Sequence, residues 1–241
     1  MASYFGEVIQ PSSRAFWNDD DDDEIIDSNQ ENRGFVIKWL EEEPSFFEKL
    51  LVIEGEMMTD FATNCLFEST TRCICTIGCE SDKYFTKVYQ VGDLCICVIG
   101  IKLDLALTGQ LSSAMIPLLN KARHLILLLA EHVSRFKSEV DNSSESFLKS
   151  LCSQKARMDK NLKTPPLNQP NIVSGVCAGV LSYAEIADLH CIMYILYTDT
   201  FTLDSKNSLP LAKLFSETFG KSISKFSAGD TSCFNKGNLY M

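Results

Sequence analysis

The cysteines of this chain have a spacing that could be read as a metal-binding site. Two C-x-C pairs occur, Cys73/Cys75 and Cys95/Cys97, and Cys79 follows the first pair. A structural zinc site takes about four such ligands, usually about two to four residues apart on loops. Both pairs lie instead within runs typical of β-strands, in which alternate residues share one face of the sheet. We therefore expect reduced, buried thiols and no metal site.

Candidate acid–base residues are few. The three histidines are His124, His132 and His190. Because His124 and His190 each precede an apolar run, edge or cap positions held by hydrogen bonds are their expected role. No nucleophile elbow, phosphate-binding loop or dinucleotide-binding glycine motif occurs in the sequence, so we assign no catalytic and no cofactor-binding residue. Thr198 and Asp199 follow an apolar run, where open α/β sheets bind ligands. An alternative hypothesis is therefore a small-molecule hydrolase or phosphorylase-like α/β enzyme centred on Thr198 and Asp199.

One apolar helix organises the rest of the pattern. Pro170 blocks a helix upstream and Asn171 can cap the next one, which predicts a helix from Ile172 to Asp188. The helix is apolar almost all round, so we expect it to be covered on two sides. Packing within this chain and an additional contact with a second protein both remain open. Small residues form a stripe along which a neighbouring backbone can approach: Gly175, Ala178, Gly179 and Ser182.

The elements around this helix predict a single α/β domain, a mixed β-sheet flanked by helices as in an α/β/α sandwich. The run Cys191–Tyr197 is typical of a central strand covered on both faces. The three consecutive strand patterns at 72–77, 84–89 and 93–100 have no long helix between them, which indicates that these strands are antiparallel neighbours. The further expected strands are 35–40, 50–53, 72–77, 84–89, 93–100 and 125–130. The further expected helices are 57–65, 109–120, which Pro117 shortens or kinks, and 210–219. The expected loops are 137–145 and 155–169.

Charge divides the chain unevenly. Of the formal charge of −10 on 241 residues, residues 1–31 carry −8, because this segment contains nine acidic residues and a single basic residue, Arg14. The nearly neutral remainder lacks the basic surface that nucleic acid requires. We expect a disordered acidic arm at 1–33, the domain at 34–221 and a flexible tail at 222–241. Without a leader pattern or an apolar run long enough to cross a bilayer, a soluble intracellular protein is expected.

The segment 168–199 resembles the corresponding segment of the proteasome assembly chaperone 1 family. Tyr4–Val8 with the acidic run after it, and the ending Leu239-Tyr240-Met241, are further short matches, whereas residues 30–160 match thinly. The resemblance implies a non-enzymatic chaperone that forms a heterodimer with proteasome assembly chaperone 2 and promotes correct assembly of the α-ring of the proteasome core particle. It also implies proteasome α-subunits as partners, no membrane partner, and a cytoplasmic location, with the nucleus as an additional compartment left open.

The carboxyl-terminal residues gain a role from the same resemblance. Leu239, Tyr240 and Met241 match the hydrophobic-Tyr-any ending that members of this family and proteasome activators insert between adjacent α-subunits. A terminal carboxylate can pair with a pocket lysine while the tyrosine buries its ring. The Gly175 to Ser182 stripe is the expected heterodimer surface. A scaffold that binds a different partner is a third hypothesis.

Overall fold

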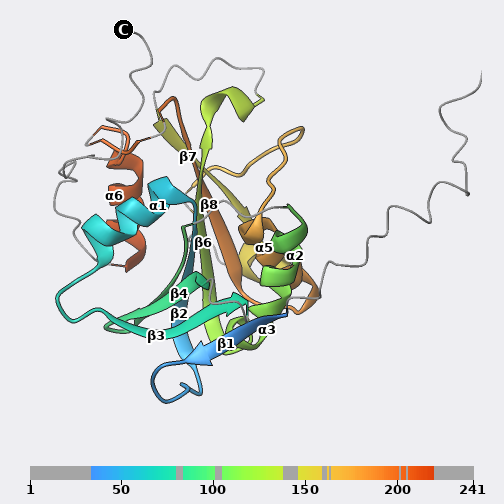
Figure 1. Ribbon diagram of the computed structural model, residues 1–241. Helices are drawn as coiled ribbons and strands as arrows, with labels where there is room; N and C mark the ends of the chain where they lie inside the picture. The colour runs from blue at the N-terminus through green and yellow to red at the C-terminus, as the bar shows by residue number, and fades with distance from the viewer. Residues whose placement is uncertain are drawn as a thin grey trace, which may run out of the picture. The chain divides into compact units, whose positions relative to one another are not determined.

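An eight-stranded mixed β-sheet lies at the centre of the fold (Figure 1), with strand order β1-β3-β4-β5-β2-β6-β8-β7. A computed structural model describes residues 34–79, 84–100, 105–137, 146–158, 162, 164–200, 202–204 and 206–219. The acidic arm expected at 1–33 lies outside the described residues, as do Leu239, Tyr240 and Met241 in the expected tail at 222–241.

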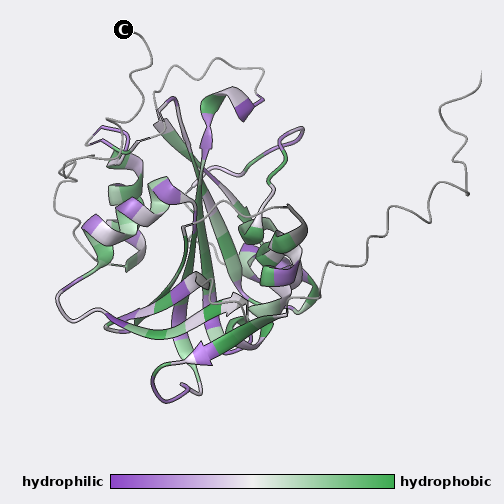
Figure 2. Ribbon diagram, viewed as in Figure 1, coloured by the Kyte–Doolittle hydropathy of each residue, from purple (hydrophilic) through white to green (hydrophobic). Residues whose placement is uncertain are grey.

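Four neighbouring strands run parallel and form the buried middle of the sheet. They are β5 (Leu94–Ile99), β2 (Phe47–Glu54), β6 (Ala122–His132) and β8 (Cys191–Thr198). Their sequences are nearly continuous apolar runs because helices cover both faces of a parallel sheet. Figure 2 shows these central strands coloured as hydrophobic along most of their length.

Antiparallel strands flank the parallel core on both sides. On one side β1 (Phe35–Trp39), β3 (Arg72–Cys79) and β4 (Tyr84–Val91) continue the sheet from β5. The antiparallel pairing of β3 with β4 and of β4 with β5 confirms the arrangement predicted for the three consecutive strand patterns. On the other side β7 (Ser146–Cys152) pairs with β8.

Helices pack on both faces of the sheet. On one face lie α2 (Leu105–Ala114), α3 (Ile116–Leu119) and α5 (Val176–Ile186), which share a core with residues such as Leu127 and Ile195 (Figure 1). The sheet is thus covered on this side by three elements from two distant parts of the sequence.

A second core fills the space on the opposite face. Its helices are α1 (Glu56–Phe61), the π-helix η2 (Ala62–Leu66) and α6 (Leu209–Phe219). Phe61 and Phe215 pack with ring centroids 5.3 Å apart. Two short helices, η3 (Val133–Arg135) and α4 (Gln154–Arg157), follow β6 and β7. The predicted fold, a mixed sheet between helical layers, is therefore confirmed.

Some predicted elements are wrong in detail. The apolar helix begins at Val176, not Ile172, because the Asn171 side chain binds the backbone of Lys137 (Lys137 N–H to Oδ1, 2.7 Å) and does not cap the helix. The predicted shortening or kinking of the 109–120 helix by Pro117 is confirmed, because two helices meet at Met115 and Pro117 lies in the first turn of the second. Part of the loop expected over 155–169 belongs to α4.

The predicted central strand Cys191–Tyr197 is confirmed, because β8 pairs with β6 on one side and β7 on the other and its residues belong to the cores on both faces of the sheet. The sequence pattern did not predict β7, whose residues are mostly half-buried and mix polar with apolar side chains.

None of the helices within the described ranges combines the length and the apolar character that a membrane span requires.

Candidate functional site

The carboxyl ends of the parallel strands bring together polar side chains from distant parts of the sequence. Glu54 ends β2, His132 ends β6, and Thr198 ends β8, with Asp199 next in the chain. Ligands of open α/β sheets bind outside this edge. The contacts of these residues therefore decide what chemistry the edge can perform.

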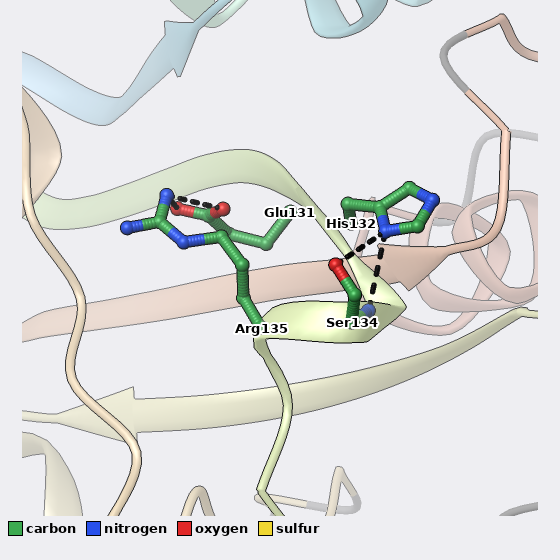
Figure 3. A network of polar contacts seen from close by, with 4 residues as sticks. All are labelled: Glu131, His132, Ser134 and Arg135. Atoms are coloured by element: carbon green, nitrogen blue, oxygen red, sulfur yellow. Dashed lines mark hydrogen bonds and ion pairs between the residues drawn. The ribbon is translucent and has the colours of Figure 1, made fainter.

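His132 links the ends of β6 and β8. Its Nδ1 lies 2.8 Å from Ser134 Oγ and accepts the Ser134 backbone N–H at 3.2 Å (Figure 3). Since Nδ1 accepts, Nε2 carries the ring proton and donates it to the Asp199 carbonyl oxygen, 3.2 Å away. Arg135 donates to both oxygens of Glu131 at 2.9 and 3.1 Å beside this network. The imidazole thus joins two strand ends through backbone groups.

Thr198 and Asp199, the predicted centre of an enzyme, lie at this edge but have different surroundings. Thr198 is buried, its Oγ1 lies 3.3 Å from Thr200 Oγ1, and it accepts the Thr200 backbone N–H at 3.4 Å. Asn207 donates to Thr200 Oγ1 at 2.8 Å from the segment before α6. Asp199 is exposed. The hydroxyl groups therefore hold the turn between β8 and α6.

The four residues of the predicted small-residue stripe divide into two pairs. Gly175 lies against the Glu54 carboxylate, and a Cβ atom at Gly179 would lie 2.6 Å from Ser112 Oγ of α2. Both glycines thus serve close packing within the chain. Ala178 is half-buried and Ser182 is exposed, so the outer side of the stripe consists of these two residues.

The outer side of α5 is almost free of charge. Ile186 continues the Ala178 and Ser182 positions at four-residue spacing, and its side chain is 85% exposed. Across α2, α3 and α5 the only charged residue is Glu185, whose Oε2 accepts the Gln154 backbone N–H at 2.7 Å. The helical layer on this face is therefore a weakly polar surface.

The predicted burial of the paired cysteines is confirmed for Cys75, Cys95 and Cys97, which belong to the core beneath α2 and α5. Burial raises the pKa of Cys75 to about 12 and that of Cys95 to about 11. Cys73 is half-buried, and Cys79 is the last residue of β3. In the part of the chain that the structure describes, no group of three or more potential ligand side chains is placed to hold a metal ion.

His124 and His190 lie at the amino ends of β6 and β8, at the opposite end of these strands from His132. Their Nδ1 atoms are 3.3 Å apart, and their rings meet edge to face with centroids 4.6 Å apart. The predicted edge or cap positions with hydrogen-bonded rings are thus confirmed as positions at the starts of two interior strands.

Sequence reasoning missed two residues of functional interest. Glu54 was included in no predicted site, although a charged residue directly after a buried apolar run is an available signal. Ile186 was assigned to the predicted helix without a surface role, because periodicity does not identify the exposed side of a helix that is apolar all round.

A family model described as proteasome assembly chaperone 4 matches residues 113–237, slightly more than half of the chain. This chain belongs to that proteasome assembly chaperone family. Among curated relatives, proteasome assembly chaperone 1 of Bos taurus is 37% identical over 90 residues, and that of Homo sapiens is 34% identical over 86 residues. Each match covers 35% of this chain and 29% of the relative, so the chain matches less than a third of the length of these relatives.

Two solved structures share the fold of this chain although their sequence identity to it is low. PbaA of Pyrococcus furiosus, an archaeal homolog of proteasome-assembly chaperone, aligns with a TM-score of 0.60 at 13% identity, covering 78% of this chain and 88% of that chain. PbaB of Pyrococcus furiosus, an archaeal proteasome activator, aligns with a TM-score of 0.58 at 8% identity, covering 80% and 91%.

Proposed function

We propose that this chain is a non-enzymatic assembly chaperone that forms a heterodimer with proteasome assembly chaperone 2 and promotes correct assembly of the proteasome α-ring. The observation that carries the proposal is the family match over residues 113–237, supported by the fold that the chain shares with archaeal PbaA. At the carboxyl edge, the contacts of His132, Thr198 and Asn207 hold strand ends and turns together. These structural roles favour binding over catalysis.

The proposed contact with the α-ring is the chain's own carboxyl end. Leu239 and Tyr240 would fill an apolar pocket between neighbouring α-subunits, and the Met241 carboxylate would pair with a pocket lysine. These residues follow both the matched range and the described residues. The support is therefore the sequence motif together with family membership, and a short contact of this kind gains strength when a larger docked surface raises its effective concentration.

The proposed heterodimer surface is the outer side of α5, formed by Ala178, Ser182 and Ile186. An exposed isoleucine beside small residues on a helical layer with one charge provides an apolar area that a partner can cover. Gly175 and Gly179, the other members of the predicted stripe, act here by letting α5 lie close to Glu54 and Ser112.

Affinity purification of the full chain with an amino-terminal tag tests both contacts. Deletion of residues 239–241 should reduce recovery of α-subunits and leave recovery of proteasome assembly chaperone 2 unchanged. Ser182→Arg should reduce recovery of that partner, because a charged side chain would enter the apolar contact. Ser216→Arg is the matched control, since Ser216 is an exposed serine on α6 on the other face of the sheet. Unchanged recovery in both test variants would contradict the proposal.

We also propose that the protein is located in the cytoplasm, with the nucleus as a second compartment to be tested. Immunofluorescence together with fractionation of cells is the measurement.

A further inference from the structure

The carboxylate of Glu54 binds the first turn of α5. Oε1 accepts the Val176 backbone N–H at 2.9 Å, and Oε2 accepts the Cys177 backbone N–H at 2.7 Å. The donors lie 122 and 123 residues further along the chain. The first N–H groups of a helix have no partner within the helix and carry partial positive charge. Glu54 therefore holds the position that a bound anion takes at a helix N-terminus.

Gly175 makes this close approach possible. A Cβ atom there would collide with Glu54 Oε1. The residue also has a φ of 104°, a backbone conformation that residues other than glycine rarely adopt. As the N-cap residue of α5, Gly175 also provides no side-chain cap of its own. The cap is thus contributed by another element, and every larger residue at position 175 would collide with it.

The location of Glu54 is where an open α/β sheet binds a ligand. β2 lies between β5 and β6, and Glu54 is its last residue at the carboxyl edge. The next residue is also held, since the Gly55 backbone N–H donates to the Ile99 carbonyl of β5 at 2.8 Å. The Cys177 thiol lies close by, and its pKa is raised by burial and, to a smaller extent, by the Glu54 charge.

We propose that Glu54 is an internal ligand that occupies the anion site at the N-terminus of α5 and so joins this helix to the end of β2. In the natural chain the site is closed to phosphate and carboxylate ligands, because a carboxylate already fills it. Removal of the Glu54 side chain opens a site of matching chemistry for a small carboxylate such as acetate. The proposal rests on contacts within the described residues and is independent of the proposed chaperone function.

Chemical rescue of the full-length protein tests the proposal. Glu54→Ala should lower the thermal unfolding midpoint by about 5–10 °C, because two charge-assisted hydrogen bonds are lost and two N–H groups are left without their acceptor. Sodium acetate, compared with sodium chloride at equal ionic strength, should raise the midpoint of Glu54→Ala and leave that of the natural chain unchanged. Inorganic phosphate serves as a second probe of the same opened site.

Glu48→Ala is the matched control, because Glu48 carries the same charge on the same strand but lies at its other end, exposed and 3.5 Å from Arg123. Equal effects of acetate on Glu54→Ala and Glu48→Ala would overturn the proposal. If Glu54→Ala does not fold, Glu54→Gln is used, which keeps the length but not the charge. Its Val176 and Cys177 amides should exchange hydrogen at least about tenfold faster than in the natural chain; unchanged exchange would refute the internal ligand.

Discussion

At the scale of single residues, burial determines the protonation state of the cysteine side chains. Five cysteines, Cys75, Cys95, Cys97, Cys177 and Cys191, lie in the core between the sheet and the α2/α5 layer. Burial disfavours the charged thiolate and raises the pKa of each of these thiols. At neutral pH they are therefore protonated and act as small apolar side chains.

This burial predicts that stability falls at alkaline pH. The unfolded chain releases thiol protons near the ordinary pKa of 9.0, whereas Cys75 keeps its proton to about 12 and Cys95 to about 11. Above pH 9 the folded state therefore binds more protons than the unfolded state, so the free energy of unfolding falls as pH rises. Urea unfolding at about pH 8 and about pH 10 measures the decline.

Cys75→Ala/Cys95→Ala is the comparison for that prediction. All other ionisable side chains are the same in both proteins, so the double variant isolates the contribution of the two thiols. Its stability should decline less between the two pH values than that of the natural chain. An equal decline would assign the alkaline effect to other groups.

At the scale of elements, small residues determine how closely α5 and α2 pack. Ser112 Oγ donates to the Thr108 carbonyl at 2.8 Å and also lies 3.4 Å from the Val176 carbonyl oxygen of α5. Directly beside it, Gly179 leaves the space that the hydroxyl fills. Contact between these helices therefore depends on the absence of one methyl group.

Gly179→Ala should lower the free energy of unfolding by about 1–2 kcal/mol, since the added Cβ would lie 2.6 Å from Ser112 Oγ and 3.1 Å from Ser112 Cβ. The collision outweighs the gain in helix propensity, which is about 1 kcal/mol. In a Ser112→Gly background the same substitution should cost less, as a double-mutant cycle from urea unfolding would show. Additive effects in that cycle would mean that the two helices are further apart than described.

At the scale of the whole molecule, the chain belongs to a family of assembly chaperones and has a sheet architecture that enzymes also use. The edge strand β7 is paired at Ser150 with the later segment 165–167 of the same chain. Ser150 N–H donates to the Pro165 carbonyl at 2.9 Å, and Leu167 N–H donates to the Ser150 carbonyl at 2.8 Å. The outer side of α5, within the helical layer that has a single charge, is the surface that we propose for the partner.

The proposed function predicts that Asp199→Asn leaves recovery of proteasome assembly chaperone 2 and α-subunits unchanged. His132 contacts the backbone carbonyl of Asp199, and this contact is retained when the exposed carboxylate becomes an amide. Quantitative mass spectrometry of the purified complexes is the measurement. Loss of either partner would contradict this prediction. Turnover of an ester or nucleoside by the natural chain but not by this variant would favour the enzyme hypothesis.

Much of the fold was predictable because strand and helix patterns are local. The runs at Leu94–Ile99 and Cys191–Thr198 are apolar at nearly every position, and such runs indicate buried strands without any knowledge of their neighbours. The short spacing of β3, β4 and β5 likewise predicted antiparallel pairing. β7 was missed because its side chains are half-buried, which gives neither a continuous nor a clearly alternating pattern.

The sequence by itself determined the α/β class, the burial of three of the four paired thiols and the resemblance to the chaperone family, since each depends on residues close together in the chain. Tertiary structure alone decided the order of the strands, the inward role of Gly175 and Gly179, and the binding of Glu54 to α5. The Glu54 contact joins residues more than a hundred positions apart. Local patterns indicate a carboxylate at the end of one strand and the start of a helix elsewhere in the chain. Only the folded chain brings the carboxylate within hydrogen-bond distance of the helix.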